Sequence, residues 1–529
     1  MTIPVGTQIP GPAGPAGATR RGQRIRAAAW ALVGVSTAAV VAVPARLPFY
    51  DYAEWLLQGR IVHEILTGGT VDGQRVTEIY SLLPVPVPNL AAPAGIALLN
   101  LVLPIEVAGR VFLLLGCLGF VAGYAFLVRR LQGRPTVLEY TGPIWVLGYF
   151  LDRGYVSYLF GLPLAFVGIA ALQPVLAGRP LSRRRACGIA ALGLLTFLAH
   201  LIPWGVLVLA VLMHAVVLAR RARRREAAAL VATCLPAVVL LAWYAAAAPV
   251  DHHLSFYTSL RDKALALAEP FQAFLRLDPF PSVVPTTVIE VVVVLGLVGL
   301  AVDGLRARRR DLAHPVVLTA ALLAVVAVLD PVGNVNSLTK PDQRLVFPAV
   351  LMLLAALRWK RATAGRRGVV VAAVVLLAGL HLVQLLAVQS DLRDLTSAAR
   401  RVVPPTARVA TDAVSVDGGC GSTVGPTIGL PALKWVDVDR LLASGQLRAD
   451  LQETSGIALR PGLPPAGLTP LNSAPDRIGA AIAAAGSPPY VEVFACPTDL
   501  RGVPDQLGDG YGVAAAGSNY LILERQAAG

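Results

Sequence analysis

The chain is 529 residues long, with 55% apolar and only 15% charged side chains. A soluble chain would carry about a quarter charged residues, and the mean hydropathy here is +0.64, so a soluble enzyme of several domains is excluded. The net charge is +14, but residues 390–529 hold 14 acidic and 11 basic side chains, so the remainder carries +17. That charge lies in short loops between apolar segments, a pattern typical of membrane orientation signals and not of nucleic-acid binding.

The apolar segments predict an α-helical polytopic membrane protein with about 11 transmembrane helices. The predicted spans are 27–45, 107–128, 136–151, 156–178, 186–199, 203–219, 227–249, 286–302, 315–330, 344–358 and 368–389. Six basic clusters lie between them, at Arg20–Arg26, Arg129–Arg134, Arg179–Arg185, Arg220–Arg225, Arg306–Arg310 and Arg358–Arg367. Placing all six clusters in the cytoplasm puts the N-terminus inside and the C-terminal region outside.

The spans divide the chain into three parts. Residues 1–26 read as a disordered cytoplasmic tail, and residues 27–389 as the transmembrane domain with a long first external loop at 46–106. Within that loop, Leu90–Pro104 is apolar but only about 15 residues long, so we expect a re-entrant or interfacial helix.

Residues 390–529 predict a small extracytoplasmic α/β domain. Its strand-like runs are Arg408–Asp412, Tyr490–Ala495 and Asn519–Glu524, and Val438–Asp450 is helix-like. Cys420 and Cys496 are the only two cysteines of this part. Because the external compartment permits disulfides, we expect these two to be bonded.

The external loops gather acidic, imidazole and cationic side chains on one membrane face. Asp51 follows the first span and is placed on one helix face with Glu54 by their i, i+3 spacing. A carboxylate there can take a proton from an acceptor hydroxyl, which is the work of a general base. Alternatively, Asp51 only caps the helix that follows it. His200, in a tight turn between two spans, and Asp251, after another span, are placed on the same face.

This arrangement resembles the GT-C superfamily of membrane glycosyltransferases, which take sugar from a polyprenyl-phosphate donor. Asp51 with Glu54 takes the position of that family's acidic motif in the first external loop. Further similar stretches are Pro86–Leu90, Glu106–Arg110, Gly154–Tyr155, Gly161–Pro163 and Thr196–His200.

The resemblance implies a catalytic group of Asp51, Glu54, His200 and Asp251. It also implies cations for the donor phosphate, and Arg344, Lys340 and Arg153 stand at external span ends where a lipid phosphate would lie. Each of these cations can instead be an interfacial anchor, with Arg344 paired to Asp342. No cofactor is assigned. A divalent metal is left open, because His63, His200 and His252-His253 are available as ligands but lack the spacing of a metal motif.

We therefore predict a glycosyltransferase of the bacterial cell membrane that moves sugar from a polyprenyl-phosphate lipid to a glycan or lipid acceptor of the cell envelope. Its partners would be these two substrates and membrane lipid, without nucleic acid. A transporter or lipid flippase and a non-catalytic envelope-assembly scaffold are the alternatives. A transporter would carry ionisable residues near mid-span, where this sequence has almost none.

Overall fold

A computed structural model describes most of the membrane part of the chain and selected pieces of the rest. The described residues are 20–49, 51–71, 74–247, 254–271, 314–335, 338–357, 359, 362–404, 407, 409–413, 457–459, 468–470, 482–483, 487–494, 500, 503, 510–517 and 520–526. The predicted span 286–302, the helix-like run Val438–Asp450 and both external cysteines lie outside these residues.

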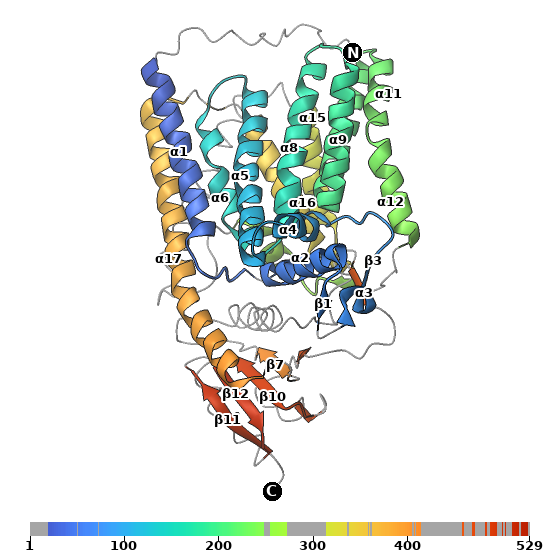
Figure 1. Cartoon of the computed structure of the whole chain (residues 1–529). Helices are drawn as coiled ribbons and strands as arrows, with labels where there is room; N and C mark the ends of the chain where they lie inside the picture. Colours follow the sequence, from blue (N-terminus) through green and yellow to red (C-terminus); the bar gives the residue numbers. More distant parts are fainter. Residues whose placement is uncertain are drawn as a thin grey trace.

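The membrane part is a bundle of apolar helices (Figure 1), as the hydropathy predicts. Within the described residues, five helices are long and apolar enough to cross a bilayer, and α11 with α12 forms a sixth candidate bent by 40°. The five are α1 (Arg20–Ala42), α5 (Ile105–Gln132), α8 (Val156–Leu176), α10 (Leu201–Arg220) and α17 (Ala364–Val402). The bundle also contains α9 (Arg183–Ala199), α11 (Arg224–Ala232), α12 (Leu235–Ala247), α15 (Pro315–Leu329) and α16 (Pro341–Ala356).

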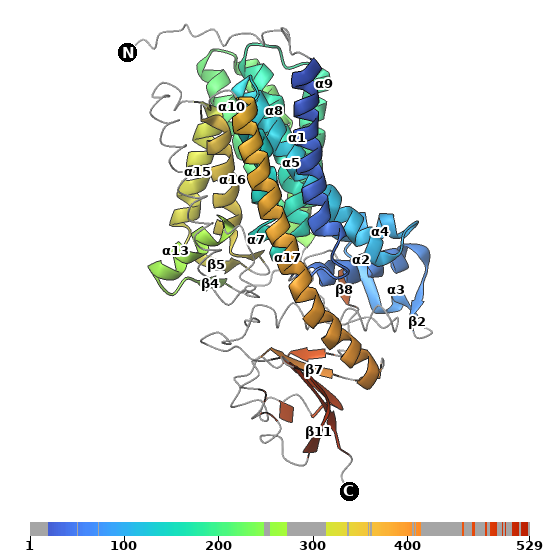
Figure 2. The same cartoon turned by 90° about the vertical axis from the view of Figure 1, so that its left-hand side faces the viewer.

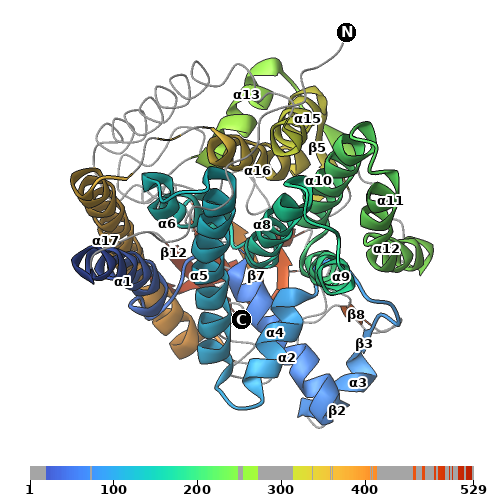
Figure 3. The ribbon, with the colours of Figure 1, turned by 90° about the horizontal axis from the view of Figure 1, so that it is seen from above.

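The predicted span 136–151 crosses the bundle, but not as one helix. It is broken into η1 (Val137–Tyr140), α6 (Gly142–Val146) and α7 (Tyr149–Asp152), and nearly all of its side chains are buried. Irregular backbone is tolerated at membrane depth only where protein surrounds it, since lipid cannot bond its free N–H and C=O groups. Figure 3 shows α6 enclosed among the helices, and this position permits the breaks.

The two ends of the bundle differ in charge. At the arginine end, defined by Arg26, Arg129 and Glu139, the Glu139 carboxylate is fully buried and pairs with both guanidinium groups, at 3.3 Å and 2.6 Å. Other basic clusters lie at this same end, at the start of α9, the junction of α10 with α11, and the start of α17. The described clusters thus share one end, as the orientation rule predicts.

The opposite end, here called the loop end, carries the first loop. Its helices α2 (Tyr52–Thr67) and α4 (Ala91–Asn100) lie across the base of the bundle (Figure 1). With 10 residues, α4 is only about 15 Å long, half the thickness of a bilayer core, so it does not span. The Leu90 N–H donates to Leu198 O at 2.9 Å, and the Ala92 N–H to Ser157 Oγ at 3.1 Å, which tie α4 to the bundle.

Short strands complete the first loop and the neighbouring loops. The first loop holds β1 (Thr70–Val71), β2 (Gln74–Arg75), α3 (Val76–Ile79) and β3 (Tyr80–Leu82). A separate sheet joins β4 (Leu254–Phe256), β5 (Val332–Val335) and β6 (Leu338–Thr339). Beside it lie α13 (Leu260–Ala268) and η2 (Glu269–Phe271). Segments from opposite sides of residues 272–313 therefore meet at the loop end.

Helix α17 links the bundle to the C-terminal strands. Its 39 residues measure about 58 Å, so it runs past the predicted boundary at residue 390 and projects beyond any bilayer (Figure 2). It ends against a five-stranded mixed sheet of order β11-β12-β10-β7-β9.

The strands of that sheet are β7 (Val409–Ala413), β9 (Leu468–Pro470), β10 (Tyr490–Phe494), β11 (Tyr511–Ala516) and β12 (Tyr520–Arg525). The three strands expected from sequence are present as β7, β10 and β12. One further strand, β8 (Ile457–Leu459), pairs antiparallel with β3 of the first loop.

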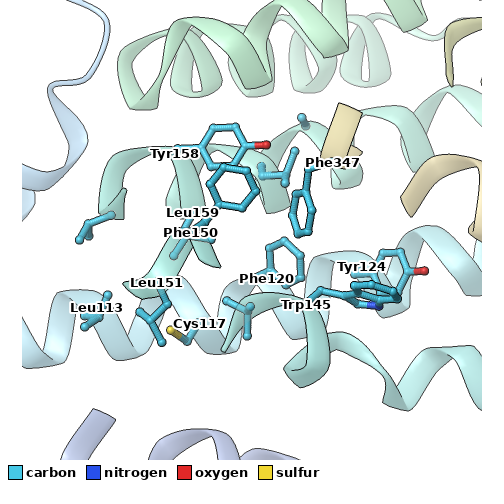
Figure 4. Close-up of a cluster of buried hydrophobic side chains, with 14 of the residues drawn as sticks. Leu113, Cys117, Phe120, Tyr124, Trp145, Phe150, Leu151, Tyr158, Leu159 and Phe347 are labelled. Atoms are coloured by element: carbon cyan, nitrogen blue, oxygen red, sulfur yellow. The ribbon is translucent and has the colours of Figure 1, made fainter. Parts of the chain in front are cut away.

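An aromatic cluster lies inside the bundle (Figure 4). The Phe150 ring lies 4.7 Å from the rings of both Tyr158 and Phe347, and Phe347 lies 6.3 Å from Phe120. Phe150 precedes Arg153, and Phe347 follows Arg344, each by one helical turn. Packing of these rings therefore sets where both cations emerge.

The charge cluster around Glu139 predicts a stability effect. Replacing it by Gln keeps the hydrogen bond to the Thr136 N–H (3.1 Å) but removes the negative charge between Arg26 and Arg129. Breaking a buried pair costs about 3–5 kcal/mol, and we expect less here because both guanidinium groups are partly exposed. The Glu139→Gln variant in detergent should unfold several degrees lower than wild type. The matched control is Glu78→Gln, because its pair with Arg75 is largely exposed. An equal Tm for both variants would contradict the role of Glu139.

Candidate functional site

The turn Arg153–Tyr155, between α7 and α8, holds Asp51 in place. The Asp51 N–H donates to Arg153 O at 3.2 Å, and the Trp55 Nε1–H donates to Gly154 O at 2.8 Å. Gly154 has φ +71°, and a Cβ on it would stand 2.6 Å from the Asp51 nitrogen. Only glycine lets α2 begin this close to the turn. Asp51 occupies the N-cap position of α2, yet its side chain makes no capping hydrogen bond, so helix capping does not account for an aspartate here.

The same turn holds Arg344. The Arg344 guanidinium lies 4.1 Å above the centre of the Tyr155 ring and is only 7% exposed. Its Nη1 lies 3.1 Å from His200 Nε2, and Tyr158 Oη donates to its backbone oxygen at 3.0 Å. Tyr155 lies only two positions after Arg153, whose carbonyl oxygen accepts the hydrogen bond from the Asp51 N–H. Asp51 and Arg344, far apart in the sequence, are thus fixed on one three-residue turn.

His200 lies beside Arg344 as a neutral imidazole. It caps α10 and is buried, with Tyr158 at its ring edge. Burial and the adjacent Arg344 charge hold the pKa of this imidazole well below its ordinary value. The Ile202 N–H donates to Nδ1 at 3.2 Å, and Arg344 Nη1 faces Nε2. A neutral imidazole accepts at only one of its two nitrogens, so it does not accept from both donors at once. As a neutral ring, His200 lies against the guanidinium without adding a second positive charge.

Lys340 lies in a network on the first turn of α16. Its Nζ donates to Glu269 Oε2 at 2.7 Å, and Gln343 Nε2 donates to the same oxygen at 2.6 Å. Tyr149 Oη donates to Gln343 Oε1 at 2.6 Å, and the Arg153 guanidinium lies 5.5 Å from the Tyr149 ring. Burial raises the pKa of the Glu269 carboxyl, but the bonds from Lys340 and Gln343 outweigh it, and the pKa lies below its usual value.

Asp342, for which the sequence left open a pair with Arg344, pairs with Lys263. Its carboxylate is fully buried and accepts from Lys263 Nζ at 2.7 Å and from Tyr257 Oη at 3.0 Å. Lys263 also donates to Asp330 O at 2.6 Å. These bonds fasten α13 to the start of α16, so Asp342 has a structural task that leaves Arg344 to other partners.

The remaining predicted residues have different outcomes. Glu54 lies in the first turn of α2, one turn from Asp51, as expected. Asp251, His252, His253, Cys420 and Cys496 lie outside the described residues, so their predicted roles stay predictions. In the part of the chain that the structure describes, no three His, Cys, Asp or Glu side chains gather as a metal site.

The sequence did not indicate the roles of Glu269, Gln343 and Tyr149. Glu269 accepts from both Lys340 and Gln343, and Tyr149 donates to Gln343 while its ring lies 5.5 Å from the Arg153 guanidinium. Glu269 and Tyr149 are polar residues in largely apolar stretches, Gln343 stands between two charged residues, and their partners lie on distant segments. Position along the chain gives no signal for such a network. A weak signal existed for Tyr155, which lies in a stretch already noted for its resemblance to the GT-C family.

The close approach at Gly154 predicts a selective loss of stability. Gly154→Ala and Gly133→Ala each place a side chain at a positive φ, +71° and +64°, and so share a strain of about 1 kcal/mol. Only the first meets backbone, since nothing lies within 4 Å of a Cβ at Gly133. Gly154→Ala should therefore lower the Tm in detergent clearly more than Gly133→Ala. Equal shifts would show that α2 does not begin against this turn.

The lowered pKa of His200 predicts a pH dependence of stability. Below the ordinary His pKa of 6.5 the unfolded chain binds a proton that folded His200 does not, so this residue lowers stability progressively as pH falls. In His200→Gln, whose amide oxygen can still accept from Arg344, that contribution is gone. Thermal unfolding from about pH 7 to pH 5 should then show a shallower loss of Tm in the variant than in wild type. Parallel curves would show that His200 is protonated in the fold.

The comparisons with known proteins come from structure alone. No protein-family model matches the sequence, and a search of curated proteins returns no match. The apo crystal structure of ArnT from Cupriavidus metallidurans is similar over 94% of this chain and 98% of its own, with 11% identity and a TM-score of 0.48. The cryo-EM structure of arabinofuranosyltransferase AftD from Mycobacteria is similar over 97% of this chain, which spans 40% of that protein, with 15% identity and a TM-score of 0.47. At this low similarity we base the assignment of function on the geometry of the site.

Proposed function

We propose that this protein is a membrane glycosyltransferase that transfers sugar from a polyprenyl-phosphate donor to an acceptor of the cell envelope. One observation carries the proposal: Asp51 and the buried guanidinium of Arg344 are held by the same turn, at the end of the bundle opposite the arginine clusters. A proton acceptor and an anion-binding cation that contact the same turn suit transfer from a phosphate to a hydroxyl.

The reaction uses these groups in complementary roles. The Asp51 carboxylate takes the proton of an acceptor hydroxyl, whose oxygen then bonds to the anomeric carbon of the donor sugar. The bond from that carbon to the phosphate oxygen breaks, and polyprenyl phosphate leaves with its electron pair. Arg344 has several N–H donors, so it binds a phosphate oxygen while His200 holds it in place. Lys340 and Arg153 supply further positive charge, and Glu54 and Asp251 are the proposed supporting acids.

The loop end suits a lipid-linked donor. The end of α4 and the turn that follows it expose Leu98, Leu101 and Val102, at 62%, 57% and 81%. Exposed apolar side chains on a helix too short to span are typical of a segment lying in the membrane surface. A polyprenyl chain in the bilayer would then place its phosphate at the depth of this end. With the arginine end in the cytoplasm, the site faces outward and transfer takes place outside the cell.

Transport is the second candidate, and two buried imidazoles favour it. His214 lies inside α10, 3.1 Å from Gln173 Nε2, and His381 lies inside α17, with Nε2 3.5 Å from Asp152 Oδ1. Ionisable groups inside a membrane bundle often mark a transport path.

Replacing Asp51 by Asn, at unchanged protein level, separates the two candidates. The amide keeps the shape of the side chain but accepts no proton at neutral pH, and loss of a general base costs about 10²–10⁴-fold in rate. We expect the envelope glycan profile of this strain to lose one linkage while the lipid-linked donor accumulates. The Glu78→Gln strain is the control, because that carboxylate lies in the same loop and pairs only on the surface. A wild-type profile in the Asp51→Asn strain would rule out Asp51 as the base, and an equally silent gene deletion would favour transport or a scaffold.

A further inference from the structure

The Glu269 carboxylate pairs with Lys340, the cation nearest to Arg344 in the sequence. One oxygen, Oε2, accepts both from Lys340 Nζ at 2.7 Å and from Gln343 Nε2 at 2.6 Å. Both donors lie at the first turn of α16, which also carries Arg344. An ammonium and an amide that converge on one anionic oxygen form the kind of contact that a phosphate oxygen also makes.

Helix α13, which precedes Glu269, has contacts of its own with α16. Lys263 of α13 pairs with Asp342 at 2.7 Å and also donates to Asp330 O. The same Gln343 Nε2 that binds Glu269 also donates to Ala266 O of α13, at 2.8 Å. The Glu269 side chain, by contrast, is 21% exposed and that of Lys340 is 33% exposed. Glu269 can therefore leave Lys340 while α13 stays bound to α16.

We propose that the Glu269 carboxylate is an internal stand-in for the phosphate of the ligand: it fills the anion subsite of Lys340 and Gln343, and an incoming phosphate monoester displaces it. This inference rests on the proposed function, since it deepens the description of the same site. The sugar donor is a phosphate diester with one negative charge and two free oxygens, whereas the polyprenyl phosphate released by transfer is a monoester with up to two negative charges and three free oxygens. The monoester therefore replaces one carboxylate and also reaches Arg344. The displacement costs affinity, because only the fraction of molecules with an open subsite binds.

The Glu269→Gln variant tests the stand-in by a binding measurement. The amide oxygen still accepts from Lys340, but it no longer competes as an anion. We expect the purified full chain in detergent to bind farnesyl phosphate at least about tenfold more tightly than wild type. In the double variant Glu269→Gln/Lys340→Gln the gain should disappear. Glu226→Gln, which neutralises a glutamate paired with Arg223 at 2.6 Å at the arginine end, should bind as wild type does.

The outcomes separate the sources of the phosphate. A gain for farnesyl phosphate with little gain for inorganic phosphate supports a lipid headgroup as the natural occupant. An equal gain for both supports the stand-in but assigns the subsite to free phosphate, against the lipid donor. Unchanged or weaker binding of both probes to a Glu269→Gln protein with wild-type Tm overturns the stand-in.

A measurement on wild type covers the case in which the variant fails to fold. Saturating farnesyl phosphate should increase the hydrogen–deuterium exchange of the amides of residues 266–269 and 271, because the displaced carboxylate releases η2. Unchanged or slower exchange there, with the probe bound, overturns the inference. Both experiments measure binding and not transfer, and Asp51 makes no part of the Lys340–Glu269 contact. The binding results can therefore contradict the role of Glu269 while Asp51→Asn still abolishes transfer. Conversely, the binding results can support the role of Glu269 while Asp51→Asn leaves transfer unchanged.

Discussion

The burial of Arg344 is the constraint on which the rest of the site depends. A guanidinium removed from water costs several kcal/mol unless other groups replace its hydration. Here a ring face from Tyr155 and an imidazole nitrogen from His200 do so, which requires α8, α10 and α16 to meet at one point. Because Tyr155 also ends the turn against which α2 begins, the same packing fixes Asp51.

The broken segment between α5 and α8 makes this meeting possible. A straight helix over 136–151 would have a single axis along its whole length. The breaks after η1 and α6 change the direction of the chain, so that α7 places Tyr149 against Gln343 of α16, with Arg153 directly after α7. The backbone groups freed by the breaks are surrounded by protein, which spares them contact with lipid. An irregular element in the centre of the bundle thus positions polar groups at its edge.

Sequence patterns predicted the parts of the fold that depend on composition. The long apolar runs of α1, α5, α8, α10 and α17 identify themselves by hydropathy, and the arginine clusters predict which helix ends lie together. The breaks within 136–151 were not predicted, because hydropathy depends on composition and does not report backbone irregularity inside an apolar run. Short α4 was predicted, since its length alone excludes a span.

Sequence patterns predicted that the described candidate residues lie at one end of the bundle, but not which of them touch. Asp51, His200, Arg344, Lys340 and Arg153 do lie together at that end, as their positions at span ends suggested. Which of them touch is decided by loops that return from distant segments, as the contact of Glu269 with Lys340 shows. Single-sequence patterns hold no record of such contacts, and the Asp342–Lys263 pair was accordingly missed as well.

A structure of the full chain in lipid nanodiscs with bound polyprenyl phosphate tests the central claim most directly. The account predicts the phosphate beside Arg344 and Lys340 at the loop end, with Asp51 on the side open to an acceptor and the prenyl chain leaving toward the lipid. A phosphate bound at the arginine end, or one out of reach of Arg344, would contradict it.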